Sequence, residues 1–337
     1  MPGQRVAILG ATGMVGREFI GILQQRDFPV SELVLLASDR SAGKTMAFRS
    51  REIVVQETTP GSFRGIDIVL ASAGAEISRE FSPIAAAAGA VVVDNSRAFR
   101  MDPEIPLVVP EVNIEDAKGH HGIIANPNCS TIQMVVALNP IHKINPIRRI
   151  IVDTYQAVSG TGSNAVDELM DQSRVVLEGG EAKPKVYPQQ IAFNVLPHIE
   201  PFQENGYSRE EMKMLHETRK IMHAPDILVS ATTVRVPISV GHSESMHVEL
   251  TEPMTPEEAR EILSRAPGVV VMDDPANNVY PTPWFAAGRD ETFVGRIRKD
   301  ISHPNGLAMW VVADNIRKGA ALNAVQIAEA LIQNSWL

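Results

Sequence analysis

Short apolar runs recur along the first part of the chain, and each is followed by a polar or glycine-rich segment. They lie at residues 5–9, 33–37, 67–71, 90–94 and 122–125. Continuous apolar runs of this length are typical of strands that are buried on both faces of a parallel sheet. Segments with helical spacing follow the first and third runs, up to about residue 26 and at residues 76–88. This alternation predicts an N-terminal α/β domain with a parallel sheet.

The second part of the chain alternates less regularly. We expect strands at residues 149–158, 227–236 and about 246–250, and an alanine-rich amphipathic helix at residues 315–331. Another helix is predicted to begin after Ser208, a favourable N-cap residue, with Glu210 and Glu211 in its first turn. The C-terminal helix could return to the first domain.

A glycine-rich turn follows the first predicted strand. Gly10, Gly13 and Gly16 are spaced G-x-x-G-x-x-G, a variant of the dinucleotide-binding pattern G-x-G-x-x-G. Such glycines allow close approach of a pyrophosphate to the N-terminus of the next helix, although they also serve plain strand–helix packing. The position directly after a buried strand at the start of the chain favours cofactor binding. The candidate contacts are Gly10, Thr12, Gly13, Met14, Val15 and Gly16.

The polar segment after the second predicted strand bears on the choice of dinucleotide. In this fold the end of the second strand lies beside the adenosine ribose, where arginine and hydroxyl groups suit a 2′-phosphate. The segment offers Ser38, Arg40, Ser41 and Lys44. This set favours NADP, whereas Asp39 would disfavour the phosphate unless it points away. The alternative interpretation is a solvated polar loop without a function.

Cys129, the only cysteine of the chain, lies between a predicted strand and a predicted helix at residues 131–142. At a helix N-terminus the unpaired N–H groups and the helix dipole favour the thiolate, which is the nucleophilic form. Its polar neighbours are Asn126, Asn128, Ser130 and Thr131. They argue against the alternative, a buried free cysteine that acts as a small apolar residue. Cys129 is therefore a candidate for covalent catalysis.

Composition narrows the class of protein. A length of 337 residues suggests two domains, and 44% hydrophobic with 21% charged residues is ordinary for a soluble enzyme. A net charge of −9 argues against nucleic acid as the main partner. A single cysteine excludes an internal disulfide and a cysteine-cluster metal site, and a functional thiol fits the cytoplasm. The N-terminal apolar stretch is too short for a signal peptide, and neither a transmembrane length nor a metal-binding spacing appears.

Further candidate residues stand beside predicted strands. Arg100 follows the fourth strand at an edge where ligands bind in open α/β sheets, although a surface arginine is the alternative. Glu210 and Lys213 share a helix face, either as site residues or as an ordinary surface ion pair. His242 is the one histidine in a glycine-flanked loop after a strand, and that strand carries Arg235.

Five motifs occur in an order and with a spacing that resemble the aspartate-β-semialdehyde dehydrogenase family, over nearly the whole chain. They are residues 10–16, 126–131, 155–162, 235–237 with 241–243, and 313–321. Each alone is a weak indication, whereas the five in order are specific. The resemblance implies an α/β fold with a Rossmann-like dinucleotide-binding domain at residues 1–128, completed by residues 315–337. It also implies an α/β catalytic and dimerisation domain at residues 129–314.

The resemblance further implies the roles of individual residues. Cys129 resembles the nucleophile, His242 the general acid/base, and Gln156 the residue that orients the acyl intermediate. Arg235 resembles the ligand of the substrate α-carboxylate, and Glu210, or else Glu211, that of the amino group. Arg100 and Lys213 resemble the phosphate ligands, so that the implied substrate-binding residues are Arg100, Asn128, Glu210, Lys213 and Arg235. The further implied cofactor contacts are Ser159, Gly160, Gly162 and Asn315.

The implied reaction is NADPH-dependent reductive dephosphorylation of L-aspartyl-4-phosphate to L-aspartate 4-semialdehyde and phosphate, through a thioester on Cys129. It belongs to the biosynthesis of lysine and diaminopimelate, methionine, threonine and isoleucine. The implied assembly is a homodimer or tetramer in the cytoplasm, without nucleic acid, membrane or metal. Two alternatives stay open: an N-acetyl-γ-glutamyl-phosphate reductase, which has the same build but a different cysteine loop, and a catalytically idle relative that binds NADP.

Overall fold

The computed structural model describes residues 3–337, and the chain forms two compact units. The first unit comprises the described residues up to Asn128 together with Ala320–Leu337, and the second comprises Cys129–Gly319. The sequence-based division at 314/315 thus falls a few residues before the structural one. The expectation for the extreme N-terminus lies partly outside the described chain, because residues 1 and 2 are not among the described residues.

A seven-stranded sheet forms the centre of the first unit. In spatial order its strands are β3 (Thr45–Phe48), β4 (Arg51–Glu57), β2 (Val30–Ala37), β1 (Gln4–Leu9), β5 (Ile68–Ala71), β6 (Val91–Asp94) and β7 (Ile123–Ala125). Neighbouring strands are parallel, except that β3 runs antiparallel to β4 at the edge. The five apolar runs form β1, β2, β5, β6 and β7, so the predicted parallel sheet is confirmed.

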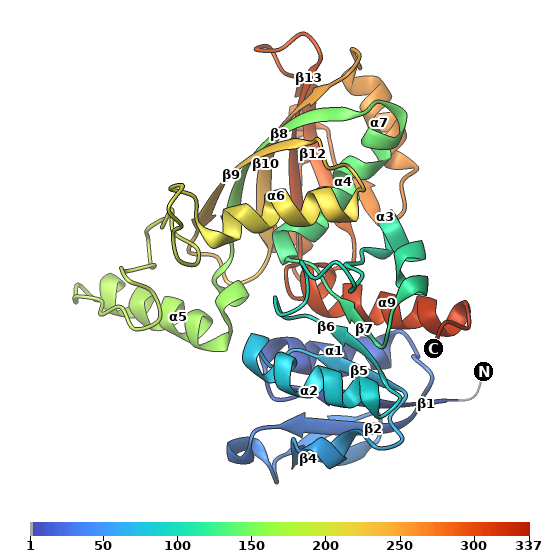
Figure 1. Ribbon diagram of the computed structural model, residues 1–337. Helices are drawn as coiled ribbons and strands as arrows, with labels where there is room; N and C mark the ends of the chain where they lie inside the picture. Colours follow the sequence, from blue (N-terminus) through green and yellow to red (C-terminus); the bar gives the residue numbers. More distant parts are fainter. Residues whose placement is uncertain (1–2) are drawn as a thin grey trace. The chain divides into compact units, whose positions relative to one another are not determined.

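Helices cover both faces of this sheet, which explains why its strands are apolar throughout. The helices of the first unit are α1 (Met14–Gln25), α2 (Ala75–Ala87), α3 (Pro110–Asn113) and α9 (Leu322–Gln333). Val6 and Ile8 of β1 belong to a fully buried cluster with side chains of α1 and α9. Ala7 and Leu9 face the other way and pack in a cluster that includes Phe81 of α2. Figure 1 shows α1, α2 and α9 with the strands of this unit.

The sequence pattern did not predict β3 and β4, because little of either strand is buried. Val55 is the buried residue of β4, and its neighbour Val54 is 53% exposed. The exposed positions of β4 include the charged residues Arg51, Glu52 and Glu57, and such residues are common near the edge of a sheet. The pattern therefore resembles that of a polar loop.

A six-stranded mixed sheet forms the centre of the second unit. In spatial order its strands are β11 (Val269–Val271), β12 (Thr292–Lys299), β13 (Gly306–Ala313), β10 (His242–Leu250), β8 (Ile147–Gln156) and β9 (Leu228–Arg235). β8 and β9 run parallel, as do β11 and β12, and the other neighbouring pairs are antiparallel. The strands β8, β9 and β10 confirm predictions, whereas β11, β12 and β13 were not predicted.

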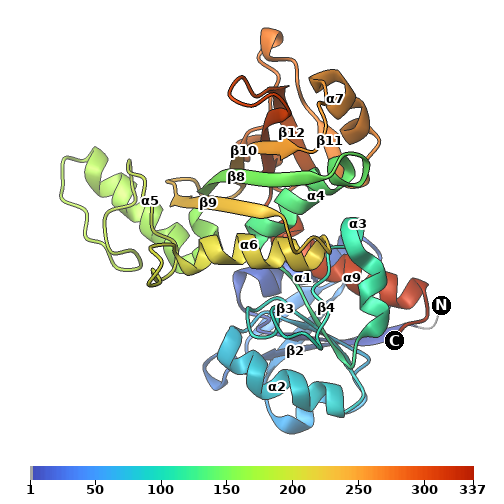
Figure 2. The same cartoon turned by 45° about the horizontal axis from the view of Figure 1, so that its top comes forward.

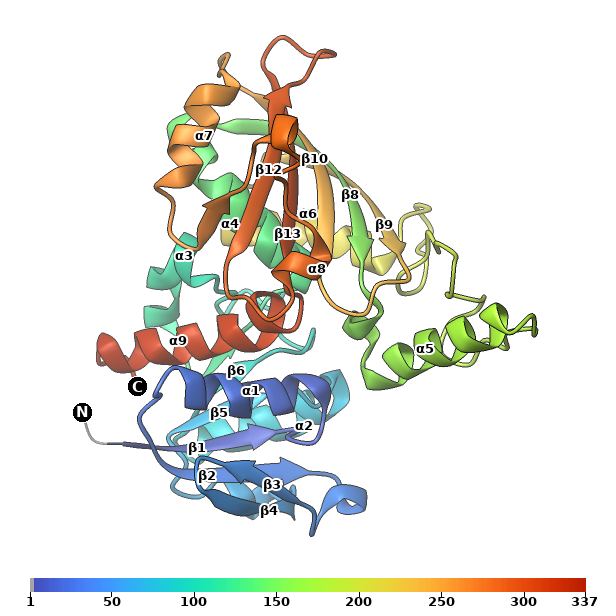
Figure 3. The same ribbon diagram turned by 180° about the vertical axis from the view of Figure 1, so that it is seen from behind.

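The two faces of the second sheet differ. The helices of this unit are α4 (Cys129–Ile144), α5 (Ser163–Leu177), α6 (Arg209–Ile221), α7 (Pro256–Ser264) and α8 (Pro283–Ala286). The helices α4 and α6 pack on one face, where Val152 and Thr154 of β8 are fully buried (Figure 2). The alternate residue Tyr155 belongs to the opposite face and is 38% exposed. Figure 3 shows the sheet from this side, with α8 in front of β13. The short helix α8 packs on that face beside Phe293 and Val312.

Two predicted boundaries were wrong. His242 was expected in a loop, but it is the first residue of β10 because its pairing with Ala313 of β13 extends the strand. The C-terminal helix was expected from residue 315, but α9 begins at Leu322. The carboxylate of Asp314 accepts backbone N–H groups just after it, and a π-helical turn, Arg317–Ala321, comes before the helix.

Across residues 3–337, no helix is long and apolar enough to span a membrane. Within the same range, no three His, Cys, Asp or Glu side chains are grouped in a way that could hold a metal ion.

Candidate active site

Three predicted side chains meet at one edge of the second sheet because of the direction of its strands. Gln156 ends β8 and Arg235 ends β9, and the two residues pair across these parallel strands. His242 opens β10, which is antiparallel to β8 and so begins where β8 ends. The three residues are 1%, 4% and 0% exposed, respectively. Their strand parity places them on the face that α4 and α6 cover.

Cys129 is the first residue of helix α4, which confirms its predicted position at a strand-to-helix turn. The residue is not part of a disulfide and is partly buried. The first N–H groups of a helix have no partner within the helix, and the helix dipole adds a partial positive charge there. Both effects stabilise a thiolate at this position more than at an exposed site.

The ring of His242 is fixed on one side and open on the other. The backbone N–H of Ala157 donates to Nδ1 at 3.0 Å. The other ring nitrogen, Nε2, is buried and has no hydrogen-bond partner among the described residues. Burial lowers the pKa of His242 to about 3, and the nearby charge of Arg235 acts in the same direction. The imidazole is therefore neutral around physiological pH.

Arg235 is held by the same residue that holds His242. Its Nη1 donates to the carbonyl oxygen of Ala157 at 2.6 Å, while its Nε is buried without a partner in the described chain. Gly160 lies beside both side chains, since a β-carbon on it would stand 3.0 Å from Nη1 of Arg235 and 3.3 Å from Nε2 of His242. A residue without a side chain therefore leaves room for a ligand beside both groups.

A chain of hydrogen bonds links Gln156 to helix α6. Its Oε1 accepts from Oγ1 of Thr154 at 3.0 Å, and its Nε2 donates to Oε1 of Glu210 at 3.0 Å. The other oxygen of Glu210 lies 2.9 Å from Nζ of Lys213, which is also 2.7 Å from Oε1 of Glu200. The side chains of Glu210 and Lys213 are only 5% and 14% exposed, so this is no ordinary surface ion pair.

Glu210 and Glu211 are adjacent in sequence and have separate contacts. Glu211 forms a capping box with Ser208: its Oε2 accepts the N–H of Ser208 at 2.6 Å. Its Oε1 accepts the N–H of Thr233 in β9 at 3.0 Å. Both oxygens of Glu211 therefore hold the helix start, whereas Glu210 points to Gln156. Of the two residues that the sequence left open, Glu210 is the one beside the predicted site.

Residues 314–319 connect the nucleophile to the histidine. Oδ1 of Asn315 accepts the N–H of Gly241, next to His242, at 2.8 Å, and its Nδ2 donates to Oγ of Ser159 at 3.0 Å. Gly319 packs against Cys129 and donates its N–H to the carbonyl oxygen of Asp314 at 3.0 Å. The predicted cofactor contacts Ser159, Gly160 and Asn315 thus belong to this cluster, and Gly162, with a φ of 107°, leads into α5.

The remaining predicted residues belong to the first unit. Arg100 is 8% exposed, and its guanidinium is bound by backbone carbonyls at the ends of β6 and β7: Nε donates to Asn126 at 2.9 Å and Nη2 to Asn95 at 3.0 Å. Asn126 also accepts from Nδ2 of Asn323 at 2.7 Å. These bonds anchor the segment that ends in Asn128, the residue before the cysteine.

The glycine-rich turn has the geometry that a bound pyrophosphate requires. Gly10 has a φ of 88°, and a β-carbon on it would stand 2.4 Å from the carbonyl oxygen of Ser72. A β-carbon on Gly16 would stand 2.2 Å from the carbonyl oxygen of Gly10. Gly13 is the N-cap of α1 and offers no side-chain cap, and no acidic residue occupies the first turn, which begins with Met14 and Val15. The helix N-terminus therefore fits an anion.

The polar segment after β2 also fits NADP. Oγ1 of Thr12 lies 3.4 Å from Oγ of Ser41, so the glycine-rich turn and this segment are neighbours. Oδ1 of Asp39 accepts the backbone N–H of Arg40 at 2.7 Å. The carboxylate is thereby engaged within its own turn, while Arg40 and Ser38 are exposed. Asp39 thus does not stand in place of the hydroxyl and guanidinium groups that suit a 2′-phosphate.

Sequence reasoning missed three residues of these sites. Ala157 and Gly319 act through backbone atoms or through the lack of a side chain, so their identity gave no signal. Arg17, exposed on α1, donates from Nε to the carbonyl oxygen of Thr12 at 3.2 Å, which brings a cation to the glycine-rich turn. Its signal was its place as the first basic residue after the glycine motif.

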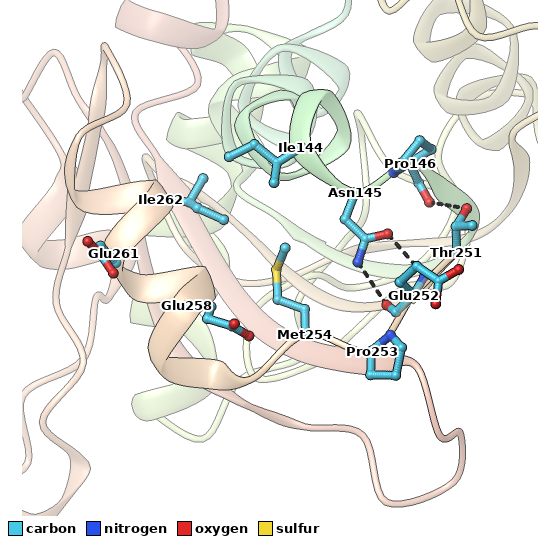
Figure 4. A pocket seen from close by; sticks show the side chains of 10 residues that line it. All are labelled: Ile144, Asn145, Pro146, Thr251, Glu252, Pro253, Met254, Glu258, Glu261 and Ile262. Atoms are coloured by element: carbon cyan, nitrogen blue, oxygen red, sulfur yellow. Dashed lines mark hydrogen bonds between the residues drawn. The ribbon is translucent and has the colours of Figure 1, made fainter.

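A cavity of about 450 Å³ lies elsewhere in the second unit. It is lined by the C-terminal end of α4 at Ile144, by residues 251–254 and by α7, where Glu258 and Ile262 line it (Figure 4). The side chain of Asn145 forms two hydrogen bonds with the backbone of Glu252: its Nδ2 donates to the carbonyl oxygen, and its Oδ1 accepts from the N–H. Because Cys129 is at the other end of α4, this cavity is separate from the edge described above.

Comparison with known proteins agrees with these features. Residues 5–120 match the family described as semialdehyde dehydrogenase, NAD binding domain, and residues 138–318 match semialdehyde dehydrogenase, dimerisation domain. An aspartate-semialdehyde dehydrogenase of Aquifex aeolicus is 59% identical over 99% of this chain and 100% of its own length. One of Bacillus subtilis is 52% identical over 98% of this chain and 97% of its own length.

A solved structure matches as well. The crystal structure of aspartate semialdehyde dehydrogenase II from Vibrio cholerae, complexed with ASA, has a TM-score of 0.97 and 49% identity over 99% of each chain. Fold and matches together define a semialdehyde dehydrogenase with a Rossmann-like domain and a second α/β domain, which confirms the predicted fold class. The chain belongs to the aspartate-semialdehyde dehydrogenase family. It is accordingly an oxidoreductase that acts on an aldehyde group and contains a domain of the NAD-binding type.

Proposed function

We propose that this chain reduces L-aspartyl-4-phosphate to L-aspartate 4-semialdehyde with NADPH and releases phosphate, as a step of amino-acid biosynthesis. One observation carries the proposal. Gln156, Arg235 and His242 meet, buried, at one sheet edge, on the face covered by the helix that begins at Cys129. This arrangement combines a nucleophile with cationic and hydrogen-bonding groups for an acidic acyl substrate.

The thiolate of Cys129 attacks the acyl carbon of the substrate. A carbon–sulfur bond forms, the carbon–oxygen bond to phosphate breaks, and phosphate leaves with that electron pair and takes a proton from water. When bound, NADPH supplies the hydride that reduces the resulting thioester to the aldehyde. Cys129 then leaves as the thiolate, so the protein returns to its starting state.

The substrate groups find partners of opposite charge in the second unit. The guanidinium of Arg235, whose Nε is buried without a partner among the described residues, suits the α-carboxylate. Glu210 suits the α-ammonium group, and its bond to Gln156 places that amide beside the acyl group. Lys213 is assigned to the phosphate. Arg100 is also assigned to the phosphate, and Asn128 is assigned to the substrate.

The residues assigned to the dinucleotide form two groups. The first group is Gly10, Thr12, Gly13, Met14, Val15, Gly16, Ser38, Arg40 and Ser41, and the second group is Ser159, Gly160, Gly162 and Asn315. The tight glycine turn and the uncapped start of α1 support the first group. We assign residues up to 128 with the C-terminal helix to dinucleotide binding, and the second unit to catalysis and dimerisation.

Two copies are proposed to meet through the less covered face of the second sheet. The matched dimerisation domain spans residues 138–318, which contain this sheet. Tyr155 and Trp310 lie on that face with ring centroids 5.4 Å apart, and Tyr155 is 38% exposed. Aromatic residues of this kind are enriched in protein interfaces. A cytoplasmic location suits the enzyme, because a catalytic thiol is kept reduced there.

The proposal is tested in the reverse direction, by NADPH formation from aspartate semialdehyde, NADP and phosphate at the nicotinamide absorbance. Sustained turnover should require phosphate. Without phosphate, the thioester should accumulate and give a burst of one NADPH per active subunit. NAD replaces NADP in a parallel reaction to measure cofactor preference.

Two controls decide the outcome. Cys129→Ala should lose the burst and the turnover while its NADPH binding stays close to that of the wild type. Turnover in that variant, or turnover without phosphate, would contradict the covalent mechanism. Faster conversion of N-acetyl-γ-glutamyl semialdehyde than of aspartate semialdehyde would move the substrate assignment to the acetylated compound.

A further inference from the structure

A buried carboxyl group and a buried amide lie next to each other between β10 and α4. Glu244 of β10 is 0% exposed, and Gln133 of α4 is 1% exposed. Burial raises the pKa of Glu244 well above 4.5, and the side chain of Gln133 is close enough to act against this rise. Within residues 3–337, none of their four polar atoms has a hydrogen bond of regular geometry. Buried polar groups need partners, and each of these two is a suitable partner for the other.

The position of Glu244 on the sheet is one row behind the candidate site. Strand register places Glu244 opposite Thr154, and each of them is two residues from a site residue of its own strand, His242 or Gln156. The hydroxyl of Thr154 donates to Oε1 of Gln156 at 3.0 Å, so the two rows are in contact. Alternate residues of a strand face the same side and are about 6.7 Å apart, so Glu244 faces α4 directly behind the site.

Gln133 has the matching position on the helix. It follows Cys129 by four residues, so both lie on one helix face, about 6 Å apart along the axis. Residues 145–146 turn the chain from α4 back into β8, to which β10 is antiparallel, so α4 and β10 both run away from the site edge. Four residues on the helix thus correspond to two on the strand. Contact between Gln133 and Glu244 therefore places Cys129 over the row of His242.

Apolar side chains of three strands lie beside Glu244 on the same face of the sheet. Val152 of β8, Met246 of β10 and Val311 of β13 are all 0% exposed. Apolar contacts have no preferred direction, so they hold a helix on a sheet without fixing its position along its axis. A hydrogen-bonded polar pair is directional, and a single buried polar residue can fix the register of packed helices.

We propose that Glu244 and Gln133 pair by hydrogen bonds and thereby fix helix α4 on the sheet at the position where Cys129 can attack the substrate. The proposal rests on the proposed function, because it takes Cys129 as the nucleophile. A neutral carboxyl group has one donor and an acceptor, so it can bind both atoms of the amide. The terminal torsions of the two side chains rotate easily, which allows this alignment. Both are positioning residues, since they act through Cys129.

Leucine substitutions separate positioning from stability. Glu244→Leu or Gln133→Leu alone leaves the other group buried without its partner, so the urea midpoint of unfolding and the rate of the phosphate-free NADPH burst should both fall. The double variant Glu244→Leu/Gln133→Leu is apolar at both positions, so its midpoint should return to that of the wild type or exceed it. Its burst should stay about tenfold to a hundredfold slower, because Cys129 is still displaced. Recovery of the burst together with the midpoint would overturn the proposal.

Glu244→Gln and Met246→Leu are the matched controls. Glutamine keeps a donor and an acceptor at the place of the carboxyl group, so its burst should stay within about twofold of the wild type. Met246→Leu changes an equally buried neighbour that has no polar group, and its burst should also be unchanged. In the double leucine variant kcat should fall while KM for aspartate semialdehyde changes little. A burst as slow in Glu244→Gln as in Glu244→Leu would overturn the proposal.

Infrared spectroscopy tests the pairing in the folded protein. A neutral carboxyl group gives a C=O stretching band, and the band of Glu244 is identified because Glu244→Gln removes it. Gln133→Leu should shift this band to higher frequency, because the carboxyl group loses its hydrogen-bond partner. An unshifted band would overturn the pairing, whatever the leucine variants do to stability.

Failure of the proposed function has a different outcome. If the chain does not perform acyl-phosphate chemistry, the wild type gives no burst, while the infrared shift and the midpoint of the double variant still report the pair. If the function holds and the pair is only structural, the wild type gives the burst and the double variant regains it. Iodoacetamide should alkylate Cys129 at the wild-type rate in the double variant. A loss of alkylation parallel to the loss of the burst would assign the effect to the thiol itself and overturn the proposal.

Discussion

Gly319 packs so closely against Cys129 that a β-carbon on Gly319 would stand 2.9 Å from Cβ of Cys129 and 3.4 Å from its Cα. The first distance is too short for two carbon atoms. Gly319→Ala must therefore displace the nucleophile or the π-helical turn behind it. We expect turnover to fall about a hundredfold, the effect of a displacement of about 1 Å in a catalytic group, with NADP affinity nearly unchanged.

A matched control exists for that substitution. Gly21 is on α1, and a β-carbon there would meet nothing within 4 Å. Gly21→Ala should leave turnover unchanged and stabilise the protein by about 0.5–1 kcal/mol through helix propensity. Steady-state kinetics and thermal unfolding of both variants give the answer. Wild-type turnover in Gly319→Ala would show that the turn moves away without disturbing Cys129.

Glu210 and Glu211 should respond differently to the same change. Glu210→Gln removes the charge assigned to the substrate ammonium group, so we expect KM for aspartate semialdehyde to rise at least about tenfold, as for a charged hydrogen bond. Glu211→Gln keeps an oxygen for the N–H of Ser208, and glutamine serves in a capping box, so KM should stay within about twofold.

The stability of a protein variant at Glu211 completes this test. Glu211→Ala should lower the free energy of unfolding by about 1–2 kcal/mol, because the N–H groups of Ser208 and Thr233 lose their carboxylate acceptor, with little effect on KM. Kinetics and denaturant unfolding are measured on one set of samples. A larger rise of KM in the Glu211 variants than in Glu210→Gln would reverse the assignment.

Glu244 should make the stability fall as pH rises. It is 0% exposed on β10, and neither carboxyl oxygen has a hydrogen-bond partner within the described part of the chain. Burial raises its pKa well above the ordinary value of 4.5, although the nearby amide of Gln133 acts against this. The folded state therefore keeps a proton above pH 4.5 that the unfolded state releases. Each further pH unit costs up to about 1.4 kcal/mol, until pH reaches the folded pKa.

Glu244→Gln removes the titrating carboxyl group, and with it this dependence of stability on pH. The volume of the side chain stays nearly the same. Below the unfolded pKa both states hold the proton, so the variant gains nothing there. We therefore compare the stability of the variant with that of the wild type at two pH values. The difference should favour the variant more at about pH 8 than at about pH 5, by at least about 1.4 kcal/mol, which corresponds to about one pKa unit. Urea unfolding at both pH values measures the difference. An equal difference at the two values would show that Glu244 is ionised in the folded state.

Arg40 should determine the preference for NADP. Arg40→Ala is expected to weaken NADP binding about tenfold to a hundredfold, the worth of a charged hydrogen bond, and to leave NAD binding unchanged. Arg51→Ala is the control, because Arg51 is also exposed but begins β4, at the sheet end opposite the cofactor edge. Calorimetric titration with both dinucleotides measures the effect. Equal losses for NADP and NAD would assign Arg40 to another part of the cofactor.

The fold was predictable where burial leaves a periodic signal in the sequence. The strands β1, β5 and β6 are covered on both faces, so each appears as a continuous apolar run. β4 lies next to the edge strand β3, has one buried residue and therefore carries no such signal. The start of α9 was misplaced because the alanine-rich pattern continues through residues 317–321, where the carboxylate of Asp314 supports a π-helical turn instead.

The candidate site was predictable only in its chemically distinctive residues. Cys129, Gln156 and Arg235 belong to motifs that the sequence displays, and strand direction explains why two of them meet. Ala157 could not be found this way, because its backbone carries its contribution. Glu244 was passed over for a related reason: its burial follows from packing against α4, and its own sequence neighbours are polar.

The division of the chain has a consequence for biosynthesis. The sheet of the first unit is synthesised first, but one of its faces is completed by Leu322, Val325 and Leu331 of the last helix. The intervening second unit is complete once Gly319 has left the ribosome. The part that is translated first must therefore finish folding last. Until α9 arrives, α1 alone covers the face of β1 that carries Val6 and Ile8, so the nascent chain presents part of this apolar surface to chaperones for most of its synthesis.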